Sequence, residues 1–152
     1  KWYTGVPVEE LREIYQMMDC FYLLTSGEGF GIPFVEAMSC GVPVVATAYT
    51  TTKELVYDND SGRMVKLVGE ENELSAYPAE QNLDGVITGN FFVDRGFASM
   101  RDGMAQLDLL YQDPELRERL GRNGRKAAVE KYDFDGVVAP KWKKLIAGML
   151  DD

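Results

Sequence analysis

Histidine is absent from this 152-residue sequence. Histidine is the most common general acid–base residue and a common zinc ligand, so acid–base catalysis or zinc binding in this chain would have to use other side chains. The only two cysteines, Cys20 and Cys40, lack the spacing of a metal-binding pair and lie in apolar surroundings. We therefore expect two reduced thiols in the core, no metal site and no bound cofactor.

Long apolar runs and an excess of positive charge are also missing. No run approaches the roughly 20 apolar residues that a membrane helix needs, and the first residues carry no secretory signal pattern. The formal net charge of -9 argues against binding to a nucleic-acid backbone, which relies on basic patches. We expect no transmembrane segment, no nucleic-acid partner and a cytoplasmic location, and we leave open peripheral attachment to a membrane.

The remaining composition is that of an ordinary globular domain, with 45% hydrophobic and 27% charged residues. Helix and strand patterns alternate along residues 7–68, and the apolar strands suit a sheet buried on both faces. This alternation predicts an α/β fold with a Rossmann-like parallel sheet and flanking helices. The expected helices are 7–18, 33–40 and 51–57, and the expected strands are 21–25, 42–47 and 63–68.

The pattern is weaker after residue 68. Residues 69–96 read as an irregular insertion, within which 85–94 could form a small hairpin that turns at Gly89-Asn90. Three helices follow, at 97–112, from Asp113-Pro114 onward, and at about 136–150. Asp113 is a good N-cap before Pro114. We expect the last helix, which contains Trp142, to make core or interdomain contacts.

The stretch 26–41, SGEGFGIPFVEAMSCG, joins the first strand to the next helix. In parallel sheets, ligands bind at such strand ends. Gly29 and Gly31 allow a ligand close to the backbone, and the N-terminus of the helix beginning at Pro33 favours a phosphate. Glu28 and Glu36 flank this cradle as acceptors for hydroxyl groups, which suits a nucleotide sugar. A tight turn with two surface acids is the alternative.

Residues 26–47, SGEGFGIPFVEAMSCGVPVVAT, resemble the signature of retaining GT-B glycosyltransferases of the group 1 type, also called glycosyltransferase family 4. The mark of that signature is a glutamate, seven residues and a second glutamate. The segments GVPVEELREIYQMMDCFYLLTS, KELVYDNDSGRMV and DPELRERLGRNGRKAAVEKYDFD are also similar to this family. The resemblance covers about 1–68 and 97–135, whereas 69–96 departs from it.

The resemblance implies a role for each residue of the motif. Glu36 would accept hydrogen bonds from the ribose of the donor nucleotide, and Glu28 would contact the transferred sugar beside the reacting centre. The backbone amides of Gly29, Phe30, Gly31 and Ile32 would hold the sugar and the diphosphate. Residues 3–6 would lie near the base. The leaving diphosphate would take the acceptor's proton on the same face, which gives retention.

The cations for a diphosphate are scarce here. Lys1 and Arg12 are the only cations in the first 52 residues, and Arg12 belongs to a helix before the strand, away from the loop. In the family, an arginine and a lysine come from earlier strands, and acceptor groups come from an N-terminal domain. We therefore expect residues 1–152 to be one partial domain, the second half of a GT-B C-terminal domain. Its partners would be a nucleotide sugar and the N-terminal domain of the same protein.

Alone, such a fragment should be inactive, and its exposed first strand could cause self-association. Two other functions remain open: a non-catalytic nucleotide-sugar-binding or interaction module, and a GT-B-type epimerase or phosphorylase-like enzyme. The intact glutamates and glycines favour a hexosyl transferase. Asp58-Asn59-Asp60 matches a manganese-binding pattern of another glycosyltransferase fold, but the Ser-Gly that follows indicates a turn.

Overall fold

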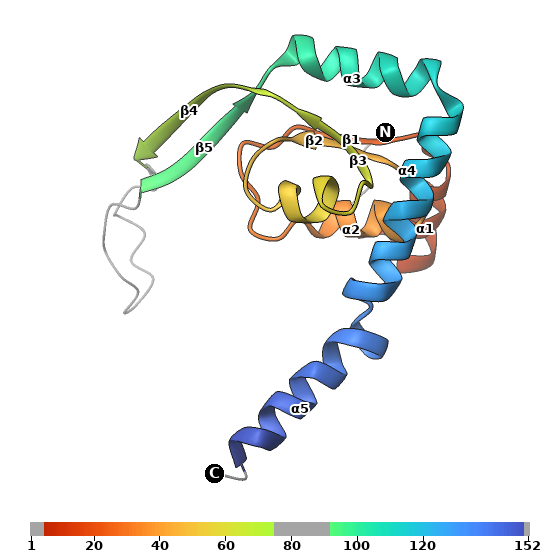
Figure 1. Cartoon of the computed structure of the whole chain (residues 1–152), viewed down its shortest axis with the longest axis vertical. Helices are drawn as coiled ribbons and strands as arrows, with labels where there is room; N and C mark the ends of the chain where they lie inside the picture. Colours follow the sequence, from red (N-terminus) through yellow and green to blue (C-terminus); the bar gives the residue numbers. More distant parts are fainter. Residues whose placement is uncertain (1–4, 75–91, 151–152) are drawn as a thin grey trace.

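A three-stranded parallel sheet lies at the centre of the computed structural model, which describes residues 5–74 and 92–150 (Figure 1). The strands are β1 (Phe21–Leu23), β2 (Val44–Thr47) and β3 (Gly62–Val65), in the order β1-β2-β3. The register pairs Phe21 with Val44 and Val44 with Gly62. The predicted α/β fold with a parallel sheet and flanking helices is therefore confirmed.

Helices connect the strands and cover the sheet. The first two are α1 (Val8–Gln16) and α2 (Ile32–Ser39), and a π-helical segment, η1 (Lys53–Tyr57), links β2 to β3. The later helical segments are α3 (Met100–Gln112), α4 (Pro114–Ala127), η2 (Ala128–Tyr132), η3 (Phe134–Val138) and α5 (Ala139–Leu150). Within the described ranges, none of the helices has the length and apolar character needed to cross a membrane.

The core lies on both faces of β2, whose four residues are all buried. On one face, Phe34, Met38 and Leu55 pack against Val44. On the other face, Leu110 of α3 and Leu120 of α4 pack against Val45. The first strand packs on both faces, as expected: Phe21 and Leu23 contact the cluster that contains Phe34, and Tyr22 contacts the cluster that contains Leu110. Its residues are only half-buried, and β1 is an edge strand of the described sheet.

Both cysteines are free thiols, as expected, although each is half-buried rather than fully enclosed. Cys40 packs against the core cluster that contains Phe34, and Cys20 packs against the cluster that contains Leu110. Burial raises the pKa of the Cys20 thiol, with a further contribution from the nearby carboxylate of Asp19. Cys20 is therefore held in its neutral thiol form.

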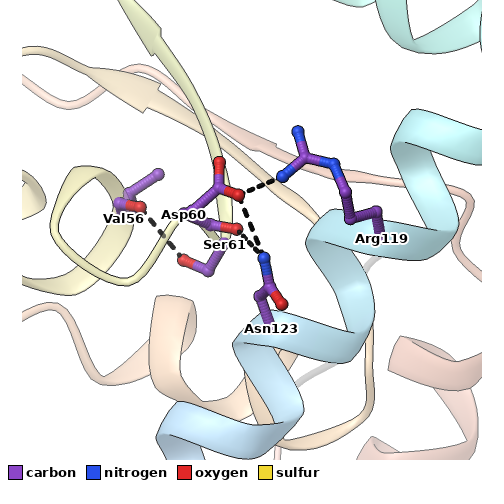
Figure 2. Close-up of polar contacts among 5 residues, drawn as sticks. All are labelled: Val56, Asp60, Ser61, Arg119 and Asn123. Carbon is purple, nitrogen blue, oxygen red and sulfur yellow. Dashed lines mark hydrogen bonds and ion pairs between the residues drawn. The ribbon is translucent and has the colours of Figure 1, made fainter.

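The turn between η1 and β3 contains the Asp58-Asn59-Asp60 sequence, as predicted. Asp60 has a left-handed backbone, with a φ of 45°. Figure 2 shows its carboxylate facing α4, where Arg119 forms an ion pair with it and Asn123 donates a hydrogen bond at 3.0 Å. Asp60 therefore fixes α4 against the turn, which gives this acid a structural role.

The segment after β3 differs from the sequence prediction. An antiparallel pair, β4 (Leu67–Leu74) and β5 (Phe92–Ala98), occupies both ends of the range expected to be irregular. Residues 92–94, the described part of the hairpin expected over 85–94, pair with β4, and Phe92 lies opposite Leu74. The expected turn at Gly89-Asn90 lies outside the described residues. Acidic β4 lacks alternating polarity, so its pairing could not be read from periodicity.

Two helix boundaries also shift. The helix expected over 97–112 begins only at Met100, because the preceding residues belong to β5 and Ser99 is the N-cap. The last helix, expected over 136–150, begins at Ala139 after η3. By contrast, Asp113 caps α4 as predicted, since its carboxylate accepts the amide of Leu116 at 2.9 Å.

Asp102 should make the stability of the fold depend on pH. Its carboxylate accepts the Lys66 amide at 2.7 Å, which is the main reason that its pKa lies below the ordinary value. A lowered pKa contributes stability above the unfolded-state pKa of about 3.9, and this contribution is lost as the pH falls through the folded-state value. In urea unfolding, Asp102→Asn should lower the unfolding free energy at neutral pH by at most about 1 kcal/mol.

The difference in unfolding free energy between Asp102→Asn and the original protein should become smaller at acidic pH. Asp108→Asn on the same helix is the control, because Asp108 is exposed and, among the residues that the structure describes, its carboxylate accepts only from the Gln112 side chain, at 3.5 Å. A loss for Asp102→Asn that is equal at neutral and strongly acidic pH would contradict the role of the ionised carboxylate.

Candidate functional site

The loop 26–32 follows β1 and leads into α2 at the carboxyl end of the parallel sheet, as expected. Gly31 precedes α2 in a left-handed conformation, with a φ of 90°. A Cβ atom at Gly31 would lie 2.6 Å from Cδ2 of Phe34, so only glycine fits there. Around Gly29 there is open space. The two glycines thus have different uses: one shapes the turn and the other leaves the loop accessible.

The main-chain amides of this loop are accessible to a ligand. Within the described parts of the chain, the N–H groups of Gly29, Phe30, Gly31 and Ile32 donate to no protein acceptor. The Phe34 amide behaves differently and bonds the Gly31 carbonyl oxygen at 3.0 Å. The available N–H groups lie at the positive end of the α2 dipole, an arrangement that suits an anion.

Glu36 lies on α2 and is held by Tyr15 of α1, whose phenol donates a hydrogen bond to Oε2 at 2.9 Å. Tyr15 is buried, and its ring lies 5.5 Å from that of Phe21. Burial, strengthened by the bond to Glu36, raises the pKa of Tyr15, so the phenol remains a donor at physiological pH. No sequence signal identified Tyr15 as a partner of Glu36, because its spacing is that of a core residue.

A cavity of about 170 Å³ between α1 and α2 contains Glu36 in its wall. Arg12 lines the same cavity, whereas the sequence alone placed this arginine away from the site. The full set of lining residues is Val8, Leu11, Arg12, Tyr15, Glu36, Ser39 and Cys40. Glu28 is not among them, so the structure does not bring the two glutamates together in this cavity.

Glu28 is half-buried and is tied to the loop after β2. Its main-chain amide donates a hydrogen bond to Oγ1 of Thr50 at 3.3 Å. Because β1 and β2 are parallel, the loops that follow them lie at the same edge of the sheet. Thr50 is therefore a neighbour of the motif that the sequence did not reveal.

Two more distant segments brace the loop 26–32. Ser26 accepts hydrogen bonds from β5: its carbonyl oxygen from the Gly96 amide at 2.8 Å and its Oγ from the Arg95 guanidinium at 2.9 Å. The Phe30 ring meets the Tyr132 ring edge-on, with centroids 6.1 Å apart. Arg95 comes from the range that departs from the family pattern, so no sequence motif predicted a cation at this loop.

Comparison with known proteins identifies the family. The sequence model described as "Glycosyl transferases group 1" matches residues 1–77, just over half of the chain. O-antigen chain mannosyltransferase B of Escherichia coli is 42% identical over 78 residues, which are 51% of this chain and 19% of that protein. MMP alpha-(1->4)-mannosyltransferase of Mycolicibacterium hassiacum is 26% identical over 136 residues, or 90% of this chain and 26% of that protein.

Solved structures share the fold. The C-terminal domain of the glycosyl transferase group 1 protein LpcC from Francisella tularensis has a TM-score of 0.61 and 21% identity, and the match covers 89% of this chain and 53% of that one. Sucrose-phosphate synthase from Thermosynechococcus elongatus has a TM-score of 0.62 and 18% identity, over 97% of this chain and 30% of that one. The chain thus spans only a part of each relative, and it belongs to the glycosyl transferases group 1 family, with the α/β fold of GT-B glycosyltransferases.

Proposed function

We propose that this chain is the donor-binding part of a retaining glycosyltransferase that transfers a hexosyl group from a nucleotide-diphosphate sugar. Membership of the group 1 family supports sugar transfer. The observation that carries the proposal is the set of four consecutive amides, residues 29–32, which lack protein acceptors among the described residues and lie between Glu28 and Glu36. An anion cradle flanked by carboxylates matches a diphosphate joined to two hydroxyl-rich sugars.

Each part of the donor has a proposed partner. The amides of Gly29, Phe30, Gly31 and Ile32 bind the diphosphate and the sugar, and Glu36 accepts hydrogen bonds from the ribose hydroxyls. Tyr15 leaves the second oxygen of Glu36 for this purpose, because its phenol bonds only Oε2. Glu28 binds hydroxyl groups of the transferred sugar beside the reacting carbon. The protein then acts chiefly by positioning the reactants and stabilising charge, while the leaving diphosphate takes the acceptor's proton.

We also propose that residues 1–152 form one partial domain of a longer protein. Further cations for the diphosphate would come from earlier strands of the same domain, and the acceptor groups would come from an N-terminal domain, so the chain alone would be inactive. The apolar side of α5 fits an interdomain contact, since Trp142, Leu145 and Ile146 are 58%, 55% and 52% exposed. Figure 1 shows α5 running away from the sheet, and this helix is the surface that we assign to the missing domain.

Glu36→Ala tests the donor site directly. In the full-length protein, we expect the affinity for UDP or GDP to fall roughly 10- to 100-fold, the effect of losing hydrogen bonds to a charged acceptor. Isothermal titration calorimetry with each nucleotide measures this change. Glu13→Ala is the matched control, because Glu13 is an exposed acid of α1 and the change in net charge is the same.

The outcomes separate the candidate functions. Unchanged affinity in Glu36→Ala would contradict the assignment of this residue to the ribose. Failure of the unmodified full-length protein to bind either nucleotide would contradict the donor site as a whole. Tight binding without transfer from any UDP- or GDP-hexose would favour the non-catalytic binding module instead.

A further inference from the structure

We propose that Thr50 is a positioning residue for Glu28 and that the strained backbone at position 50 is retained because it places the Thr50 hydroxyl under the Glu28 amide. The importance of this contact for sugar transfer rests on the proposed function. The contact itself rests on the backbone conformation of Thr50, on its hydrogen bond, and on the way in which its neighbours are fixed.

The backbone of Thr50 is unusual. Its φ is 52°, and the only other non-glycine residue with a positive φ in the described ranges is Asp60. A left-handed conformation is rare for any residue with a Cβ atom and is a clear outlier for a β-branched one. Glycine would adopt it without strain. Strained residues persist only where the surrounding structure holds them, and they are often found at functional sites. We therefore expect the threonine side chain to have a role that glycine could not perform.

The residues on both sides of Thr50 are fixed by hydrogen bonds. Before it, the Ala48 amide bonds the Val65 carbonyl oxygen at 2.8 Å. After it, the buried hydroxyl of Thr52 donates to the Thr47 carbonyl oxygen at 2.6 Å and accepts the Tyr49 amide at 3.2 Å. The chain must therefore close a tight turn between two anchored points. Thr50 is at the exposed part of that turn.

The side chain of Thr50 is exposed and bonds the motif. Its Oγ1 accepts the Glu28 amide at 3.3 Å, which joins the loop after β2 to the loop after β1. Because Thr50 is exposed, removing its hydroxyl leaves neither a buried cavity nor a buried donor in the core. The hydroxyl thus contributes little to folding, while it fixes the main chain of the residue that we assign to the transferred sugar.

This combination gives Thr50→Gly opposite effects on stability and on the site. The substitution relieves the strain, so the midpoint of urea unfolding should stay the same or rise. It also removes the acceptor of the Glu28 amide, so hydrogen exchange at that amide should become roughly fivefold to tenfold faster, as for the loss of one hydrogen bond. Turnover with the donor sugar should fall by a similar factor, with the nucleotide affinity unchanged.

Thr50→Ser completes the experiment in the full-length protein. Serine keeps the hydroxyl, so exchange at Glu28 and turnover should both match those of the original protein. A Thr50→Gly variant with unchanged exchange and turnover would overturn the proposal, and so would a Thr50→Ser variant that behaves like Thr50→Gly. A lower unfolding midpoint in Thr50→Gly would contradict the strain itself.

Failure of the proposed function gives a different result. If the original protein neither binds UDP or GDP nor transfers a hexose, the donor site is wrong. The exchange rate of the Glu28 amide in the two variants still decides whether Thr50 positions Glu28, because nuclear magnetic resonance measures that rate without a sugar or a nucleotide.

Discussion

Glu28→Gln should lower the turnover of the full-length protein about 100- to 1000-fold, the usual effect of removing one preorganised group that stabilises transition-state charge. The nucleotide affinity should change little, because we assign Glu28 to the transferred sugar and Glu36 to the ribose. Glutamine keeps the size of the side chain and leaves the hydrogen bond to Thr50 intact, since the main-chain amide makes that bond. The substitution therefore tests the carboxylate alone.

Initial rates at saturating donor concentration, together with calorimetric titration of the nucleotide, separate the two effects. Asp58→Asn is the control, because Asp58 is an exposed acid in the turn before β3. This control should transfer sugar at the original rate, with or without added manganese. If Glu28→Gln lost affinity and turnover in equal proportion, Glu28 would belong to the nucleotide site and not to the reacting centre.

Gly121→Ala should destabilise the fold by about 3 kcal/mol, which is the upper part of the usual range for overpacking. A Cβ atom at this position of α4 would lie 2.1 Å from the carbonyl oxygen of Gly41. The neighbour is main chain and cannot rotate away, so α4 must move off the core. The adjacent Leu120 is fully buried and would move with it. This cost exceeds the gain of about 1 kcal/mol that alanine brings to a helix interior.

Gly148→Ala is a control with the opposite sign. Gly148 also lies inside a helix, α5, but nothing lies within 4 Å of its added Cβ atom. Alanine there should leave the stability unchanged or raise it by up to about 1 kcal/mol. Urea unfolding of both variants measures the difference. A Gly121→Ala variant as stable as Gly148→Ala would contradict the close packing of α4 against Gly41.

The local chemistry of the sequence determined the parallel sheet and the position of the loop 26–32. Apolar strand runs, Pro33 in the first turn of α2 and Asp113 as the cap of α4 act over a few residues, so their effects are readable without tertiary contacts. The Glu28–Glu36 spacing is likewise part of the sequence itself. These features were sufficient to identify the family and to predict the fold, although their roles in binding remain proposals.

Only the tertiary structure decided which side chains meet the motif. Tyr15 bonds Glu36 across 21 positions, Thr50 meets Glu28 across 22 and Arg95 reaches Ser26 across 69. The pairing of β5 with β4, which brings Arg95 to the loop, could also not be predicted from the hydrophobic periodicity of the sequence. Such contacts depend on how helices and strands pack against one another, and the packing of a whole domain is not encoded in any one local stretch of sequence.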